Sequence, residues 1–223
     1  MAPLLPQKHY NHLDVSELTK IRHSLADLAR KVQHETTRRE KNLSHNPRSV
    51  LAEYKRQQIW KRLSSNKFRD EDVMKFYFDF FDELFNCSSL KKYCKVKLSS
   101  PSTENEAEMK CRALIWSWPP KVQLVSIVIR IFKRDDITDN MTRRIFCLGR
   151  LLHEMTHAFL ELYSCWYTLC REFLQHLGPA GHGFAWQDIA HTVEKAADNP
   201  NSLNIPVQLG RYDSLLVDLD EIK

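Results

Sequence analysis

One stretch constrains the fold of this 223-residue chain more than any other, because its pattern is helical over many turns. From about residue 139, apolar residues recur every three or four positions, which places them on one face of an α-helix. They are Leu148, Leu152, Met155, Phe159 and Leu162. A helix with one apolar face has to bury that face against another layer of structure. We therefore expect this helix to pack onto a sheet.

The residues before this helix have a strand-like pattern, rich in the β-branched and aromatic residues that favour strands. Three segments have this composition: residues 93–98, 109–118 and 122–132. Pro119 and Pro120 separate the last two and indicate a hairpin, whereas the polar residues 99–108 indicate a loop. We therefore predict an α+β fold. It has a small antiparallel or mixed sheet of about three strands, packed against the long helix and further helices.

Further helices are predicted on both sides of the strands. Their apolar periods cover residues 16–32, 50–63, 73–85 and 184–198. The third is very aromatic, which predicts a core element, and Asp70 is its expected N-cap. We divide the chain into a basic helical N-terminal extension (residues 1–69), a main domain (70–200) and a C-terminal tail (201–223).

Composition limits the classes of protein to which the chain can belong. With 43% apolar residues, it is long enough to bury a substantial core. Its first residues lack the charged start and the run of about 7–15 apolar residues that make a secretory signal. No later window approaches the ~18 apolar residues needed to span a bilayer. We therefore expect an intracellular protein without a membrane partner, whose six cysteines stay reduced.

The charge is distributed unevenly along the chain. Residues 1–70 contain 15 Lys and Arg against 7 Asp and Glu (net +8), whereas residues 71–223 contain 18 against 21 (net −3). A basic N-terminal third is typical of proteins that bind a polyanion such as DNA. Solvated helix faces rich in Lys and Arg are an equally common explanation. The sequence alone leaves both alternatives open.

A metal-binding motif lies within the long helix. His153 and His157 are four residues apart, so both imidazoles lie on the same helical face and reach one ion. Glu154 follows the first histidine, where a general base can take a proton from a zinc-bound water. With 10 His and 14 Glu in the chain, about 0.03 such matches are expected by chance. The motif therefore predicts a zinc site in which Glu154 is catalytic.

A catalytic zinc needs a third protein ligand and one open position. The metzincin pattern requires Gly at position 160 and His at 163, but these residues are Leu160 and Tyr163. A thermolysin-like site requires Glu near position 177, and the nearest acidic residues, Glu161 and Glu172, are poorly placed. The metzincin subclass is therefore excluded, and the thermolysin-like arrangement is disfavoured.

Three histidines remain as candidates for the third ligand: His176, His182 and His191. His182 is favoured because Gly181 and Gly183 flank it and allow a tight turn close to a metal. Trp186, four residues later, is predicted to pack in the core, with a wall of the metal site as the alternative.

Two runs of sequence resemble the SprT-like zinc metallopeptidases, the family that includes Spartan, a protease of DNA–protein crosslinks. The runs are Leu-Leu-His-Glu-Met-Thr-His-Ala (151–158) and Gly-His-Gly-Phe-Ala-Trp (181–186). The resemblance covers about residues 70–200 and includes the order of elements: an aromatic helix, a short sheet and the helix with the motif. It implies a zinc site of His153, His157 and His182, with Glu154 as the general base for peptide hydrolysis.

The resemblance also implies a function. It is that of a zinc-dependent endopeptidase, active in the nucleus on proteins bound or crosslinked to DNA. The alternative is a non-proteolytic module in which zinc stabilises a surface for protein or nucleic acid.

This chain departs from the family pattern in two places. The loop between the second and third ligands is long and contains Cys165 and Cys170, which are expected to be thiols rather than ligands of a second metal. No Cys-x-x-Cys pair follows residue 200. Contacts to DNA are therefore expected from the basic N-terminal third, at Arg38-Arg39, Lys55-Arg56 and Lys61-Arg62.

Overall fold

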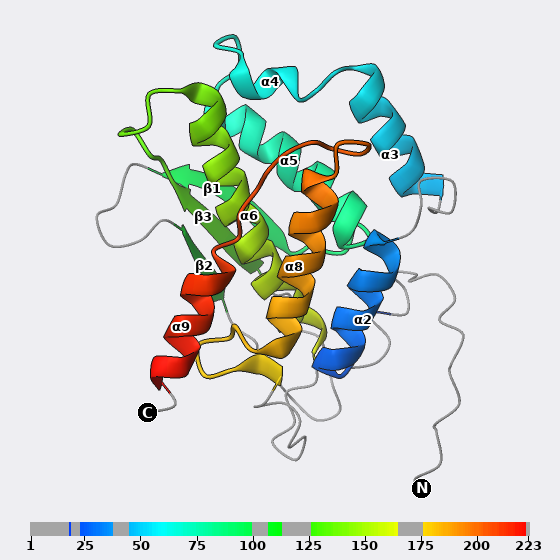
Figure 1. The fold of residues 1–223 in the computed structure, drawn as a ribbon, viewed down its shortest axis with the longest axis vertical. Coiled ribbons are helices and arrows are strands. Elements are labelled where there is room, and N and C mark those ends of the chain that lie inside the picture. The colour runs from blue at the N-terminus through cyan, green and yellow to red at the C-terminus, as the bar shows by residue number, and fades with distance from the viewer. Residues whose placement is uncertain are drawn as a thin grey trace, which may run out of the picture.

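The computed structural model describes Leu18 and residues 23–37, 45–99, 107–112, 126–164 and 176–221. These residues form helices around a small sheet, so the predicted α+β class is confirmed (Figure 1). The helices are α2 (Leu25–Thr36), α3 (His45–Arg56), α4 (Lys61–Ser64), α5 (Asp70–Phe85), α6 (Asn140–Tyr163), α8 (Phe184–Asp198) and α9 (Arg211–Glu221). The strands are β1 (Cys94–Ser99), β2 (Ala107–Arg112) and β3 (Ser126–Phe132).

The sheet has β3 at its centre, in the order β1-β3-β2. Strand β1 runs parallel to β3, with Cys94 opposite Ile127, and β2 runs antiparallel to β3, with Met109 opposite Ile129. Strand β2 begins at Ala107, inside the segment that we predicted as a loop, and the prolines of the predicted hairpin lie outside the described residues. The alternate residues Ile127, Ile129 and Ile131 of β3 are fully buried. This face of the sheet therefore forms part of the core.

Helix α6 lies across the sheet in Figure 1 and carries the predicted apolar face. It begins after Asp139, whose side chain accepts a hydrogen bond from the Thr142 backbone N–H at 2.7 Å. All five residues of the predicted stripe are buried: Leu148, Leu152, Met155, Phe159 and Leu162. Helix α8 packs against α6, and α2 packs against α8 (Figure 1). The periodicity thus correctly predicted the face of α6 that enters the core.

The N-terminal helices belong to the same hydrophobic core as the rest of the chain. Leu28 of α2 is fully buried, and Tyr54 of α3 stacks on Phe80 of α5 with ring centroids 4.7 Å apart. Each of these contacts removes apolar surface from water. The boundaries at 69/70 and 200/201 stay predictions, although residues on both sides of each share the core.

A buried arginine connects the α4–α5 region to α6. Arg144 is 3% exposed and donates to the carbonyl oxygens of Arg62 (2.7 Å), Ser65 (2.8 Å) and Phe68 (2.6 Å). Its Nε also donates to the carboxylate of Asp70 at 2.7 Å. The prediction that Asp70 caps α5 is wrong, because α5 begins at Asp70 itself and the carboxylate binds Arg144 instead.

Asp82 of α5 holds the turn that follows the helix. Its carboxylate is fully buried and accepts hydrogen bonds from the backbone N–H groups of Leu90 (3.0 Å) and Lys91 (2.9 Å). Burial raises the pKa of this carboxyl to about 6, because the two hydrogen bonds do not offset its loss of hydration.

Asp82→Asn should change how stability depends on pH. Because the folded-state pKa of Asp82 exceeds the unfolded value, the folded chain binds more protons between about pH 4 and 6. This contribution to stability is complete at about pH 4 and is lost as the pH rises to about 6. The free energy of unfolding of the wild type, relative to Asp82→Asn, should therefore fall by about 2–3 kcal/mol over this range in urea titrations.

Asp79→Asn, at a 39% exposed side chain of the same helix, also removes one negative charge but leaves Asp82 ionisable. Because the charge of Asp79 contributes to the raised pKa of Asp82, this variant should reduce the pH-dependent fall in stability without abolishing it. A difference between wild type and Asp82→Asn that stays constant from pH 4 to 6 would contradict the prediction.

Candidate metal centre

Three histidines from two parts of the chain meet at one point. His153 and His157 lie one turn apart on α6, and His182 lies in the loop that enters α8. The Nε2 atom of His157 is 3.1 Å from that of His153 and 3.0 Å from that of His182, and the remaining Nε2–Nε2 distance is 3.2 Å. The structure thus brings together the three predicted ligands.

The spacing of these nitrogens fits a single metal ion. Tetrahedral nitrogen ligands at about 2.0–2.1 Å from an ion are about 3.3 Å apart. Three imidazole nitrogens at this spacing cannot all donate hydrogen bonds to one another, whereas three lone pairs can share a cation. The three histidines are therefore close enough to bind one metal ion.

A backbone carbonyl orients the first histidine. The Nδ1 of His153 lies 2.8 Å from the carbonyl oxygen of Leu209, in the extended segment before α9. Because a carbonyl only accepts, Nδ1 carries the proton and the Nε2 lone pair faces the other histidines. This segment approaches α6 at Gly149, where a Cβ atom would lie 2.2 Å from the Gln208 carbonyl oxygen. The sequence did not reveal the Leu209 partner, because a carbonyl is present at every residue.

Trp186 forms the floor of the cluster. Its side chain is fully buried, and its ring centroid lies 4.7 Å from that of His153, 5.7 Å from that of His157 and 4.9 Å from that of His182. Trp186 therefore packs in the core and also forms one wall of the histidine cluster.

The two glycines beside His182 have different roles. Gly181 has φ +85°, and a Cβ atom there would lie 3.3 Å from the Cε1 atom of the His157 ring. A Cβ atom at Gly183 would lie 2.5 Å from the backbone nitrogen of Gly178. Gly181 thus permits the approach to the histidine cluster that we expected, whereas Gly183 permits close packing within the loop itself.

Burial keeps the three imidazoles of the cluster neutral, which is the form that binds cations. Loss of hydration lowers the pKa of His153 to about 4, places that of His157 well below its usual value and also lowers that of His182. All three rings are therefore neutral at pH 7, as metal ligands must be.

Glu154 is buried on α6, with 8% of its surface exposed. Burial raises the pKa of its carboxyl to about 7, and the nearby Arg150 lowers it only in part. A group with a pKa near the working pH exchanges protons readily, as a general base must.

The other candidate ligands lie apart from this cluster. His176 packs against Phe184 with ring centroids 6.2 Å apart, and the Nδ1 of His191 lies 3.2 Å from an Arg211 nitrogen. Glu161 lies on α6 but does not join the cluster. Cys165, Cys170 and Glu172 lie outside the described residues.

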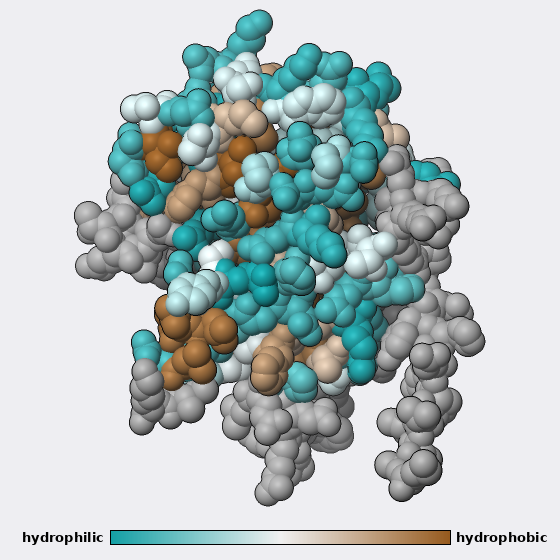
Figure 2. Space-filling view, viewed as in Figure 1, coloured by the Kyte–Doolittle hydropathy of each residue, from teal (hydrophilic) through white to brown (hydrophobic). Residues whose placement is uncertain are grey.

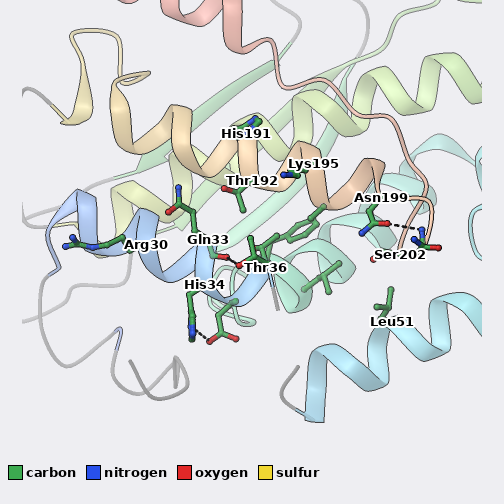
Figure 3. Close-up of a pocket in the computed structure, with 16 residues that line it drawn as sticks. Arg30, Gln33, His34, Thr36, Leu51, His191, Thr192, Lys195, Asn199 and Ser202 are labelled. Carbon is green, nitrogen blue, oxygen red and sulfur yellow. Dashed lines mark hydrogen bonds and ion pairs between the residues drawn. The ribbon is translucent and has the colours of Figure 1, made fainter. Parts of the chain in front are cut away.

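A separate hollow lies between α2, α8 and the 199–202 turn (Figure 3). Most of the residues that line it have polar side chains, Arg30, Glu35 and Lys195 among them, and none of the three clustered histidines lines it. Among the described residues, no group of possible metal ligands lines this hollow.

Comparisons with protein-family models, with curated proteins and with solved structures found no match for this chain. Among the described residues, no helix is long and apolar enough to cross a bilayer. The similarity to SprT-like peptidases therefore rests on the two motifs and on the order of elements.

Proposed function

We propose that the chain is a zinc-dependent endopeptidase of the SprT-like type, in which His153, His157 and His182 hold the zinc ion. The observation that carries this proposal is the convergence of three histidine Nε2 atoms, two of them on the helix that also carries the buried Glu154. Catalytic zinc sites use three protein ligands and keep one position open, whereas structural sites usually have four. The described residues supply three ligands, which favours a catalytic site over a structural one.

A zinc ion held here would lower the pKa of a water molecule and polarise the carbonyl of the peptide bond. Glu154 accepts the proton of the attacking water and then gives it to the leaving amine. The buried position of Glu154 suits the first step, because its raised pKa makes the carboxylate a stronger base towards the water. Leu209 and Trp186 hold the histidine rings in place, through the hydrogen bond to His153 and through ring contacts.

We propose proteins bound or crosslinked to DNA as substrates and the nucleus as the site of action. This part of the proposal rests on the family resemblance and on the net charge of +8 in residues 1–70. Three of the basic side chains predicted to contact DNA also contact protein groups: Lys55 donates to the Asn201 carbonyl oxygen, Arg56 pairs with Glu53, and Arg62 lies over the rings of Phe68 and Phe76. Their charge is thus partly used within the fold, while Arg38 and Arg39 lie outside the described residues.

Metal removal tests the proposal directly. The purified chain should contain about one zinc per molecule by elemental analysis. It should cleave a protein crosslinked to a DNA oligonucleotide, and the same protein without DNA more slowly. Treatment with 1,10-phenanthroline should abolish both activities, and added zinc should restore them. A zinc-loaded chain that cleaves neither substrate would support the non-proteolytic module instead.

A further inference from the structure

Asp218 is a buried carboxylate on a helix that is otherwise mostly exposed. Helix α9 presents Leu215, Leu216, Val217 and Leu219 to solvent, and they form the brown patch at the lower left of Figure 2. Only Ser214 and Asp218 of this helix are buried. Burying a carboxylate is costly unless polar groups compensate for its lost hydration. The partners of Asp218 therefore indicate what it does.

The loop that carries the third histidine closes around this carboxylate. The Oδ1 atom of Asp218 accepts a hydrogen bond from the backbone N–H of Ala180 at 2.9 Å. Gly178 has φ +77°, and a Cβ atom there would lie 1.8 Å from Oδ2 of Asp218. Any larger residue at 178 would displace either the loop or the carboxylate. Residues 178–182 are thus shaped to receive Asp218.

Two buried polar atoms beside each other lack hydrogen-bond partners among the described residues. They are the Nδ1 of His182 and the Oδ2 of Asp218. The same Nδ1 lies 3.7 Å from the Oδ1 of Asp218, about 0.7 Å beyond an ordinary hydrogen bond. A carboxylate oxygen can accept a second hydrogen bond, so a small rotation of the imidazole brings its Nδ1–H within reach of Oδ1. The geometry therefore pairs the third histidine with this carboxylate.

We propose that Asp218 is the positioning residue of the third ligand: its carboxylate accepts the Nδ1–H of His182 and turns the Nε2 lone pair towards His153 and His157. This inference rests on the proposed metal centre. Histidine ligands commonly donate their second N–H to a carboxylate or a carbonyl, which fixes the tautomer and raises the basicity of the ligating nitrogen. The Leu209 carbonyl accepts the Nδ1–H of His153 in this way, and Asp218, on the following helix α9, is the corresponding acceptor for His182.

Asp218→Asn is the informative substitution because it keeps the shape of the side chain. The amide oxygen can still accept from Ala180, but as a neutral group it is a weaker acceptor for the Nδ1–H of His182 than the carboxylate oxygen. Zinc affinity, measured by competition with a chromogenic chelator, should fall by about 10- to 100-fold. The thermal unfolding of the zinc-free protein should change little.

Gln187→Ala is the matched control. The Gln187 side chain donates to the Arg211 carbonyl oxygen at 3.1 Å, so its loss weakens the docking of α9 without touching His182. Zinc affinity of this variant should stay within about twofold of wild type. An equal loss of affinity in both variants would assign the effect to α9 docking and overturn the role of Asp218.

A measurement on the wild type removes the dependence on variant folding. Long-range ¹H–¹⁵N correlation spectra of the zinc-loaded protein should show His182 protonated at Nδ1 and metal-bound at Nε2. Coordination through Nδ1, or unchanged zinc affinity in Asp218→Asn, would refute the proposal while leaving the zinc site intact. A wild-type chain that binds no zinc would refute the proposed function as well.

Discussion

Glu154→Gln should lower the rate of peptide cleavage by about 100- to 10,000-fold, because the amide cannot accept the proton of the attacking water. Glutamine has the same shape, so the α6 core and the three histidines should keep their arrangement. The substitution also removes an ionisable group whose pKa burial raises to about 7, so stability above pH 7 should not decrease. Cleavage of the crosslinked substrate, zinc content and thermal unfolding measure the three outcomes.

Glu161→Gln provides a matched control on the same helix. Burial also raises the pKa of Glu161 to about 7, but this residue lies outside the His-Glu-x-x-His motif. Its cleavage rate should remain within about twofold of wild type. If Glu154→Gln cleaved as fast as Glu161→Gln, Glu154 would not be the general base.

Arg144→Ala should lower the free energy of unfolding by about 3–5 kcal/mol, which is typical when one partner of a buried charge pair is removed. The truncation leaves the carbonyl oxygens of Arg62, Ser65 and Phe68 without this donor, and it removes the closer of the two arginines that bind the Asp70 carboxylate. A loss of this size is a large fraction of the stability of an ordinary domain. Urea unfolding of the zinc-loaded variant measures it.

The neighbouring Arg143→Ala distinguishes this network from the general loss of an arginine. Arg143 also approaches Asp70, at 3.4 Å, but its side chain is 18% exposed, and it donates to one backbone carbonyl, that of Ile137, and to the side chain of Asn140. The expected loss is about 1 kcal/mol. Equal losses in the two variants would mean that the carbonyl cluster around Arg144 contributes little.

The sequence predicted those parts of the molecule that depend on short-range patterns. The apolar stripe located α6, and the spacing of His153 and His157 placed both rings on one face, because helical geometry relates residues three and four apart. The glycines beside His182 indicated that it is the third histidine of the cluster, because a close turn limits which residues fit. All three predictions use information contained within one or two turns of chain.

The features that the sequence did not predict depend on contacts between distant segments. The start of β2 at Ala107 follows from pairing with β3, which overrides the polar composition of that stretch. The carboxylate of Asp70 does not cap the N-terminus of α5, because it binds the charged guanidinium of Arg144 from α6 instead. The contacts of Leu209 and Asp218 with the histidines were not predicted for the same reason. Nothing in the sequence around either residue indicates that a histidine lies beside it in the fold.

The wrapping of the 204–221 segment around the histidine cluster has a consequence for biosynthesis. Because a chain is made from its N-terminus, His153, His157 and His182 leave the ribosome before Leu209 and Asp218 do. During that interval the imidazoles of His153 and His182 are free to rotate and to change tautomer. The ligand geometry is therefore completed only when the last of these elements has been translated and docked, and a nascent chain that ends before Leu209 carries all three histidines but not their orientation.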